Sequence, residues 1–482
     1  MPNSSPRRNR IFWVGLLALV GVAVVANASF GASFFNWPGY LYDESHPSLN
    51  NVSTVVTESN VNTLHSVWHW TPGAGPISGS NKKIFATPSV YNGTVFVGAN
   101  NGVFYALDEQ TGAVLWSRFI GYVQKHTCGA RGITSSSTVA PDPVTGVITV
   151  YVAGADGYLY ALNASTGAVA WQSVVGIPST TVNDYYNWAS PAVHNGHVFM
   201  GVSSQCDNPF VRGGLVMYDQ QTGAIQAHYY SEPAGVVGGG VWTSAVVDDN
   251  GVFVTTATPC PRKGVTDEDA CAVVSLDPNT LDRRGAWFPL YAERPNGDAD
   301  FGGSPVLFTA DLNGVSTPMV TACNKNGILY GWRQSDVSTG PVWRFRVGQG
   351  TAAGQQACLA APVWDGTHLF EAGNPTTING VSYRGSIREL DPATGTPVWQ
   401  VGLPGIVLGS PTMNGNGILA VSTYDISGAP NGTYFLRSST GAILASIPTP
   451  NNSETFAQPV FADNFVFLTP VKGGMTAYSP TP

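Results

Sequence analysis

The chain has 482 residues, of which 43% are hydrophobic and only 11% charged, and its formal net charge is −8. No cluster of lysine and arginine follows the N-terminus, which excludes the basic surface that nucleic-acid binding needs. The 56 glycines and 34 prolines favour short strands joined by tight turns over long helices.

The N-terminal residues have the pattern of a targeting segment. Three arginines between positions 7 and 10 precede an apolar run over residues 11–25, and Ala26-Asn27-Ala28 follows as a small-residue cleavage pattern. The run is short for a membrane span, which needs about 20 residues. We therefore expect residues 1–28 to be a signal peptide, with an uncleaved anchor as the alternative. In both cases the protein would be secreted or extracytoplasmic, where disulfides can form.

A repeating unit begins near residue 87 and continues almost to the C-terminus. Each unit opens with a small residue and Pro, continues through two β-rich runs to a Leu-Asp pair and a Thr-Gly turn, and often ends in a strand with Trp. The clearest copy contains Thr87-Pro88, Leu107-Asp108, Thr111-Gly112 and Trp116. Eight units begin near Pro88, Ser137, Pro191, Ser244, Pro305, Pro362, Pro411 and Pro459.

Each feature of the unit has a structural explanation. Thr-Gly supplies the positive-φ turn of a hairpin, the preceding Asp can accept hydrogen bonds from turn amides, and the outer Trp can pack on the neighbouring sheet. A single four-stranded sheet cannot bury both of its faces, so the units must stack radially. The sequence therefore predicts an all-β fold, an eight-bladed β-propeller with four-stranded antiparallel blades.

The last unit, which ends at Ala477-Tyr478, lacks a Thr-Gly turn and an outer strand. The strand-like segment 64–70, which contains Trp68 and Trp70, lies before the first unit. We expect this segment to pair with the last blade and close the ring, because closure removes an exposed sheet edge. The propeller would then span residues 61–480, with residues 29–60 as an N-terminal extension.

The six cysteines form an even set. Cys260 and Cys271 bracket a polar excursion and are expected to form a disulfide. For the other four we favour Cys128–Cys206 and Cys323–Cys358, although the sequence does not fix connectivity. A zinc site is the rival interpretation, but no Cys-x-x-Cys or His-x-x-x-His spacing supports it.

The Ala-Leu-Asp-x-x-Thr-Gly-x-x-x-Trp signature resembles the tryptophan-docking repeat of quinoprotein dehydrogenases, the pyrroloquinoline quinone (PQQ) family of eight-bladed propellers. The resemblance extends from Trp37 nearly to the C-terminus. It indicates the fold more specifically than the activity, because non-enzymatic assembly factors share the repeat.

The resemblance also nominates four site residues. Arg131, in an Arg-Gly motif, is similar to the residue that pairs with a cofactor carboxylate, and Trp242 to the stacking floor beneath the cofactor. Asp300, followed by Phe301, is similar to the family base, and Lys325, before Asn-Gly, to the cation that touches the quinone oxygens. If the resemblance holds, all four should meet in one axial cavity.

Several family features are absent from the sequence. There is no adjacent Cys-Cys pair and no Cys-x-x-Cys-His haem motif, and Gly302 stands where the lanthanide-dependent subtype has a carboxylate. The family calcium ion is held by Glu, Asn and the base Asp, whereas here the corresponding loop lacks Glu and Thr258 stands at the Asn position. Asp207, Thr258 and Asp300 are the remaining candidate ligands, fewer than the 6–8 oxygens that Ca²⁺ prefers.

Two functions follow as hypotheses. The first is an exported PQQ-dependent oxidoreductase that oxidises a small alcohol or polyol and passes electrons to an external acceptor. Asp300 and Lys325 would be catalytic, Arg131 and Trp242 would bind the cofactor, and Ca²⁺ is a further candidate cofactor. The alternative is a non-catalytic propeller that binds a protein or glycan.

Overall fold

The computed structural model describes Met1 and residues 35–77, 81–123, 126, 128–176, 184–260, 269–290, 293, 298, 300–349, 357–425 and 431–481. Apart from Met1, these residues belong to one compact unit, Phe34–Pro482. The predicted signal or anchor, after Met1, lies outside the described residues, as does the start of the predicted extension. The proposed boundary at residue 28 therefore stays a prediction, and so does the one at residue 60, which no observation tests.

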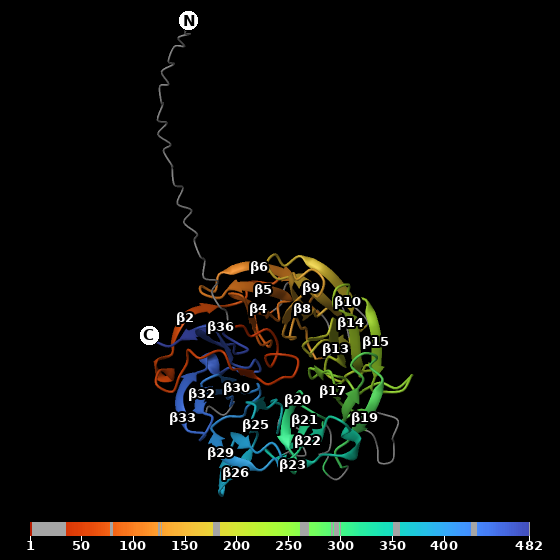
Figure 1. Cartoon of the computed structure of the whole chain (residues 1–482), viewed down its shortest axis with the longest axis vertical. Coiled ribbons are helices and arrows are strands. Elements are labelled where there is room, and N and C mark those ends of the chain that lie inside the picture. The colour runs from red at the N-terminus through yellow and green to blue at the C-terminus, as the bar shows by residue number, and fades with distance from the viewer. Residues whose placement is uncertain are drawn as a thin grey trace. The chain divides into compact units, whose positions relative to one another are not determined.

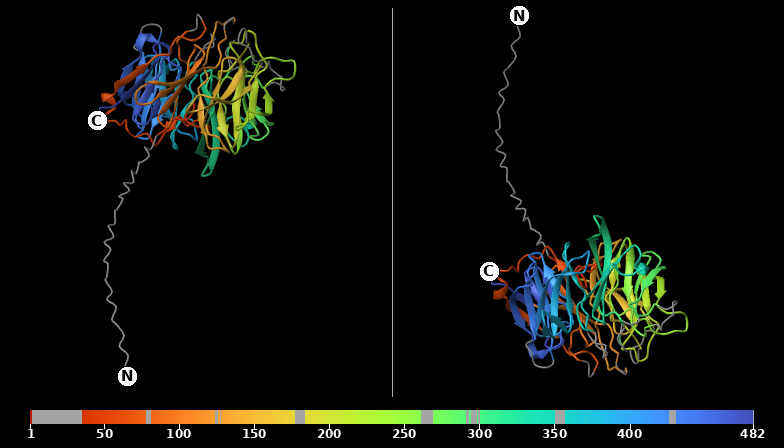
Figure 2. Two further views of the ribbon diagram at one scale, coloured as in Figure 1. Left: turned by 90° about the horizontal axis from the view of Figure 1, so that it is seen from above. Right: turned by 90° about the horizontal axis from the view of Figure 1, so that it is seen from below.

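The compact unit is a ring of eight four-stranded antiparallel blades, as predicted (Figure 1). Figure 2 shows the ring edge-on, with strands that run between its two faces. Blade 1 consists of β3 (Ser89–Tyr91), β4 (Thr94–Gly98), β5 (Val103–Asp108) and β6 (Val114–Phe119). Blade 2 consists of β7 (Thr138–Pro141), β8 (Ile148–Ala153), β9 (Tyr158–Asn163) and β10 (Val169–Val174). Blade 3 consists of β12 (Ala192–His194), β13 (His197–Ser204), β14 (Gly214–Asp219) and β15 (Ile225–Tyr230). Blade 4 consists of β16 (Val246–Asp248), β17 (Gly251–Thr255), β18 (Val273–Leu276) and β19 (Arg283–Trp287).

The second half of the ring repeats this order. Blade 5 consists of β20 (Val306–Asp311), β21 (Ser316–Asn324), β22 (Ile328–Arg333) and β23 (Trp343–Arg346). Blade 6 consists of β24 (Val363–Trp364), β25 (Leu369–Gly373), β28 (Gly385–Leu390) and β29 (Pro397–Leu403). Blade 7 consists of β30 (Thr412–Asn414), β31 (Ile418–Ser422), β32 (Gly432–Arg437) and β33 (Ile443–Pro448). Blade 8 consists of β34 (Val460–Ala462), β35 (Phe465–Leu468), β36 (Met475–Ser479) and, as its outer strand, β2 (His65–Trp70).

A few short elements supplement the blades. They are β1 (Leu49–Asn50), β11 (Tyr185–Tyr186), the hairpin β26 (Thr376–Ile378) and β27 (Val381–Tyr383), and the 3₁₀ turns η1 (Val61–Thr63), η3 (Val337–Thr339) and η4 (Pro450–Asn452). Among the described residues, no helix is long and apolar enough to cross a membrane.

The predicted closure of the ring is confirmed. Strand β2 pairs antiparallel with β36 and supplies the outer strand that blade 8 lacks. The indole of Trp68 on β2 then donates a hydrogen bond of 2.8 Å to the Glu109 carbonyl of blade 1. The first and last parts of the repeat domain are therefore joined by backbone and side-chain contacts, and this pairing covers an edge that would otherwise be free.

The same tryptophan contact recurs between most neighbouring blades. The Trp116 indole donates to the Ala164 carbonyl at 2.9 Å, and its ring lies directly over Gly167 in the turn of blade 2. A Cβ at Gly167 would lie 2.6 Å from that ring, and the glycine has φ +67°, so both space and backbone require glycine there. Equivalent ring–glycine contacts join Trp68 to Gly112, Trp171 to Gly223, Trp343 to Gly395 and Trp399 to Gly441.

A second repeated contact joins the blades near the axis. At six of the eight blade junctions, the residue that opens a unit donates its backbone N–H to the hydroxyl of the equivalent residue in the next blade. Ser190 bonds in this way to Ser244 at 2.9 Å, and Ser244 to Ser304 at 3.0 Å. The series also includes Gln458 to Thr87, Thr87 to Ser136, Ser136 to Ser190, and Ala361 to Ser410. Ala361 and Gln458 have no hydroxyl, so the series is interrupted between blades 5 and 6 and between blades 7 and 8.

The segment 37–50 crosses the centre of the ring (Figure 1). Its backbone carbonyls accept hydrogen bonds from the innermost strands of six blades, through Val90, Val139, Val247, Leu307, Trp364 and Met413. Glu44 lies 3.5 Å from His194 of blade 3, and Asn50 donates to the Phe461 carbonyl of blade 8. Every blade therefore contacts this segment.

The three expected disulfides, Cys128–Cys206, Cys260–Cys271 and Cys323–Cys358, are all present. The zinc interpretation is therefore wrong, since all six sulfurs are in disulfides. The excursion between Cys260 and Cys271 lies outside the described residues from 261 to 268.

Replacement of Ser244 by Ala should test the axial series of hydrogen bonds. The change leaves the buried Ser190 N–H without its acceptor, which should lower the free energy of unfolding by about 1–3 kcal/mol. Denaturant midpoints of the variant and the parent measure the loss. Ser117→Ala, on the exposed face of β6, is the matched control and should stay within about 0.5 kcal/mol. Equal losses in both variants would contradict a special role for the series.

His46 in the central segment should make stability depend on pH. Its Nδ1 lies 2.9 Å from the Pro305 carbonyl oxygen, and burial lowers the pKa of His46 to about 4. The unfolded chain binds this proton below pH about 6.5, whereas the folded chain resists it until about 4. Stability should therefore fall by up to about 3 kcal/mol as the pH drops through this window.

The variant His46→Asn keeps a residue that tolerates the positive φ of 62° at this position but removes the titrating ring. Unfolding midpoints measured from pH 7 to 4 should fall less steeply for this variant than for the parent. Parallel curves would show that the buried imidazole does not contribute.

Candidate functional site

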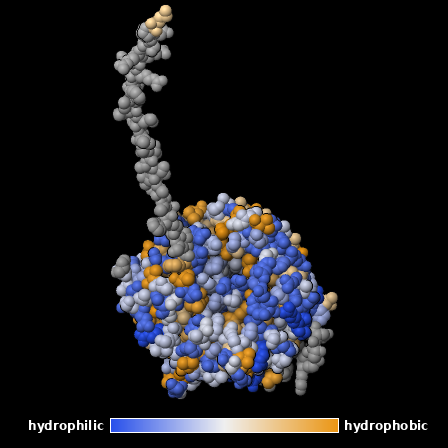
Figure 3. Space-filling model, in the orientation of Figure 1, coloured by the Kyte–Doolittle hydropathy of each residue, from blue (hydrophilic) through white to orange (hydrophobic). Residues whose placement is uncertain are grey.

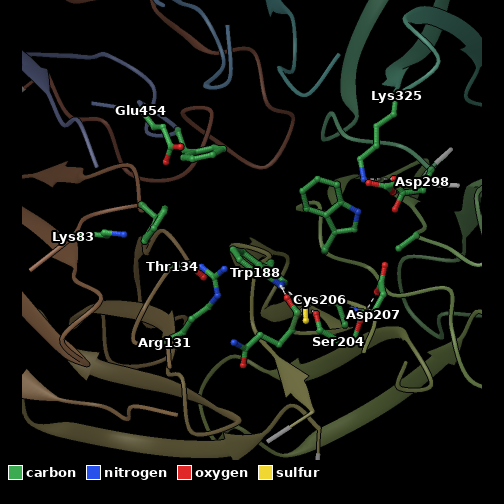
Figure 4. Close-up of a pocket in the computed structure, with 17 residues that line it drawn as sticks. Lys83, Arg131, Thr134, Trp188, Ser204, Cys206, Asp207, Asp298, Lys325 and Glu454 are labelled. Carbon is green, nitrogen blue, oxygen red and sulfur yellow. Dashed lines mark hydrogen bonds and ion pairs between the residues drawn. The ribbon is translucent and has the colours of Figure 1, made fainter. Parts of the chain in front are cut away.

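A cavity of about 560 Å³ lies where loops from several blades converge (Figure 4). This volume is within the range of about 300–1,000 Å³ that is common for small-molecule sites. Figure 3 shows one face of the ring covered mostly by polar side chains, with apolar side chains in small groups. We therefore consider the cavity as the candidate site.

The repeat determines which residues reach the cavity. Arg131, Trp188, Trp242 and Asp300 each lie in the loop just before the innermost strand of blades 2, 3, 4 and 5. Innermost strands converge on the ring axis, so the residues that lead into them are brought together although about 170 positions separate the first from the last. Lys325 follows directly after β21 and enters from the next strand of blade 5.

The structure brings five of the six predicted site residues to the wall of this cavity: Arg131, Asp207, Trp242, Asp300 and Lys325. The sixth, Thr258, is not in the wall, but its hydroxyl donates a hydrogen bond of 2.8 Å to Asp207. Their chemical roles stay predictions, because position alone does not establish them.

Lys325 is held between two carboxylates. Its ammonium lies 2.6 Å from Asp300 and 2.6 Å from Asp298, and 4.9 Å from the centre of the Trp242 ring. The Asp300 side chain is 2% exposed and the Lys325 side chain 11%, whereas Asp298 is about half exposed. The group therefore combines two carboxyl groups and one ammonium beside an aromatic ring.

Burial and charge shift the protonation of this group. Burial raises the pKa of Asp300 above its ordinary value, Lys325 opposes this shift, and Asp298 adds to it. Burial alone would lower the pKa of Lys325, but Asp300 and Asp298 outweigh that effect and raise it. Lys325 therefore stays charged, and Asp300 holds a proton more readily than an exposed carboxylate, which is a useful property for a group that accepts a proton.

Arg131 lies across the cavity from Lys325 (Figure 4). Its guanidinium lies 4.8 Å from the Trp188 ring and 5.9 Å from the Phe85 ring, so aromatic faces hold it in place. Its Nε is buried and has no hydrogen-bond partner among the described residues. A guanidinium that is held by rings and not by a carboxylate is available to bind an anionic ligand.

Sequence reasoning missed several residues of the wall. Lys83 and Phe85 precede the innermost strand of blade 1, Glu454 and Phe456 precede that of blade 8, and Asp298 lies two positions before Asp300. The register of the repeat could have identified the first four. Phe85 and Phe456 stand two residues before the axial hydrogen-bonding residue of their units, as Trp242 does, and Lys83 and Glu454 stand four residues before it, as Asp300 does. Nothing in the repeat marks Asp298.

The disulfide Cys128–Cys206 lies at the edge of the site, and Cys206 contributes to the wall. It joins the loop that carries Arg131 to the loop that carries Asp207. The side-chain amide of Gln205 also donates a hydrogen bond of 2.7 Å to the Gly129 carbonyl, which links the same two loops. The relative positions of Arg131 and Asp207 are therefore fixed by a covalent bond and a hydrogen bond.

Comparison with known proteins connects this site to a family. The family model described as "Glucose/ethanol/alcohol dehydrogenase, beta-propeller domain" matches residues 37–364, and one described as "Outer membrane protein assembly factor BamB" matches residues 383–481. The chain is 24% identical over 335 residues to a quinohemoprotein alcohol dehydrogenase of Comamonas testosteroni. It is 24% identical over 343 residues to the dehydrogenase subunit of a quinone alcohol dehydrogenase of Gluconobacter oxydans.

Both alignments include 61% of this chain but only 44% and 42% of the two relatives, so the chain spans less than half of their length. Among solved structures, the Comamonas testosteroni quinohemoprotein alcohol dehydrogenase superposes with a TM-score of 0.70 at 17% identity, covering 92% of this chain and 80% of that one. A europium-containing methanol dehydrogenase gives 0.69 at 16% identity, covering 90% and 89%.

These structural similarities establish the fold alone, but the match to the dehydrogenase propeller model covers more than half of the sequence. The chain therefore belongs to the glucose/ethanol/alcohol dehydrogenase β-propeller family.

Proposed function

We propose that the protein is an exported oxidoreductase that oxidises an alcohol or polyol with bound PQQ. The observation that carries this proposal is the meeting of Asp300, Lys325, Trp242 and Arg131 in one cavity. The names of the relatives support the same reaction class, since they are quinone or quinohemoprotein alcohol dehydrogenases.

The cavity has the chemistry that PQQ requires. PQQ is flat and carries carboxylates, and the wall offers the Trp242 ring together with three cations, Lys83, Arg131 and Lys325. The buried, unpartnered Nε of Arg131 favours an anionic occupant, because a buried donor without an acceptor is costly. Arg131 would hold a cofactor carboxylate, and Trp242 would support the ring system.

Bound PQQ would supply an acceptor for two electrons from the alcohol. Asp300 would take the proton from the substrate hydroxyl, since it is the least exposed carboxylate of the cavity wall and is held in place by Lys325. The positive charge of Lys325 would stabilise negative charge that develops beside it during the reaction. The walls of the cavity would keep bulk water from these charges.

Electrons must then leave the site. No Cys-x-x-Cys-His haem motif occurs in residues 1–482, and the electrons would pass to an external acceptor. One relative is named 1-butanol dehydrogenase (cytochrome c), which makes a cytochrome a reasonable candidate. The three disulfides support an oxidising compartment outside the cytoplasm, as the N-terminal sequence pattern predicts.

The alternative is a non-catalytic propeller that binds a protein or glycan. It is favoured by the match of residues 383–481 to the BamB model, which describes an assembly factor. Failure of the purified protein to bind PQQ, together with retention of its fold, would favour this alternative.

Reconstitution tests the proposal. PQQ titrated into the purified protein, with and without Ca²⁺, should give bound-cofactor absorbance, and the complex should reduce a redox dye when an alcohol is added. Arg131→Met should weaken PQQ binding about tenfold to a hundredfold, because it removes a charge-assisted contact of about 1.5–3 kcal/mol. Arg333→Met, at an exposed position on β22, is the matched control and should bind PQQ as the parent does. Absence of both absorbance and dye reduction in folded protein would refute the proposal.

The pH dependence of the reaction should reflect Asp300. A base must be deprotonated, and burial raises the pKa of Asp300, so kcat/KM should decline on the acid side at a pH well above the ordinary carboxyl value of about 4. Asp298→Asn removes a negative charge that raises this pKa, so the acid limb should move to lower pH. The exposed Asp282→Asn is the control. An acid limb that does not move in Asp298→Asn would contradict this assignment of the base.

A further inference from the structure

We infer that the Lys325 ammonium occupies the place of a divalent cation beside Asp300, so that the site works without Ca²⁺ and becomes a cation site only when Lys325 is removed. This inference concerns the same cavity and rests on the proposed function for its catalytic meaning. Its claim about cation binding can be tested without PQQ.

The distances at Lys325 carry the inference. Its Nζ lies 2.6 Å from an oxygen of Asp298 and 2.6 Å from an oxygen of Asp300. Ca²⁺ binds oxygen at 2.3–2.6 Å, so an ion bridging these two carboxylates would need nearly the position that the ammonium fills. The ammonium and an ion that bridges Asp298 and Asp300 therefore exclude each other.

The ammonium is not a loose surface charge. The Lys325 side chain is 11% exposed, and its Nζ is also 4.9 Å from the centre of the Trp242 ring. Burying a charge of this kind is costly unless it is paired, and two carboxylates supply the pairing. Displacement of Lys325 by a metal would leave a buried ammonium without its partners.

The other predicted calcium ligands are engaged with each other. Thr258 donates its hydroxyl to Asp207 Oδ2, and Ser204 donates its hydroxyl to Asp207 Oδ1. In the described part of the chain, no group of three acidic, histidine or cysteine ligand atoms within 4.8 Å of one another includes Asp207, Asp298 or Asp300. The Asp207 carboxylate and the Thr258 hydroxyl thus satisfy each other, and the set Asp207, Thr258 and Asp300 supplies fewer oxygens than the 6–8 ligands that Ca²⁺ prefers, so it fits Ca²⁺ poorly.

Removal of Lys325 should reverse this situation. The two carboxylates would then face each other without a counter-charge, and like charges in a partly buried site favour uptake of a cation. Lys325→Met keeps a long side chain but removes the ammonium. We expect this variant to gain a Ca²⁺ site that the parent lacks, and the double variant Lys325→Met/Asp298→Asn to lose it again.

The experiment uses the full-length, chelator-treated protein without PQQ, titrated with CaCl₂ by isothermal calorimetry and by thermal unfolding. The parent should show no saturable binding up to about 1 mM and no change in unfolding midpoint. Lys325→Met should bind Ca²⁺ at least tenfold more tightly than the parent and unfold at a higher temperature when Ca²⁺ is present. Lys83→Met removes another cavity lysine, one without an ion-pair partner among the described residues, and should behave as the parent does.

Saturable binding of one Ca²⁺ per chain by the parent, abolished in Asp300→Asn, would overturn the inference. A folded Lys325→Met variant without a response to Ca²⁺ would also overturn it. If Lys325→Met does not fold, Lys325→Gln takes its place, and the measurement on the parent still decides the first claim. Failure of the parent to bind PQQ would refute the proposed function, whereas these Ca²⁺ titrations would still decide the cation claim.

Discussion

The architecture depends on the contact between an outer-strand tryptophan and the turn glycine of the next blade. Each such ring covers a glycine with positive φ and donates its indole N–H to a neighbouring carbonyl, as Trp116 does at Gly167 and Ala164. The contact sets the angle and spacing of neighbouring blades. It also joins the two ends of the ring, because Trp68 on β2 makes the same contact with blade 1.

This arrangement also creates the site. When eight equivalent sheets are arranged around an axis, the loops before their innermost strands meet near one end of that axis. The residues at these positions differ from unit to unit, whereas the tryptophans and turn glycines that join the blades recur. Four side chains of the cavity wall lie at these positions: Arg131, Trp188, Trp242 and Asp300. The carbonyls of the central segment 37–50 accept hydrogen bonds from the innermost strands that these loops lead into.

Much of the fold can be predicted from the sequence because the same short pattern occurs in successive units. One Thr-Gly turn or one tryptophan predicts little, but eight successive units that share this pattern in part predict the number of blades and the missing strand at the end. The site is less predictable. The position of Asp300 could be inferred from family resemblance, whereas its ion pair with Lys325 and the participation of Asp298 depend on side-chain positions that no spacing encodes.

The central claim is that this cavity binds PQQ around an internal cation. A crystal structure of the PQQ complex grown in the presence of Ca²⁺ tests it most directly. The account predicts PQQ in contact with Trp242 and Arg131, with the Lys325 ammonium between Asp298 and Asp300. Electron density for a metal ion bound by Asp300 and Asp207, or PQQ bound outside this cavity, would contradict it.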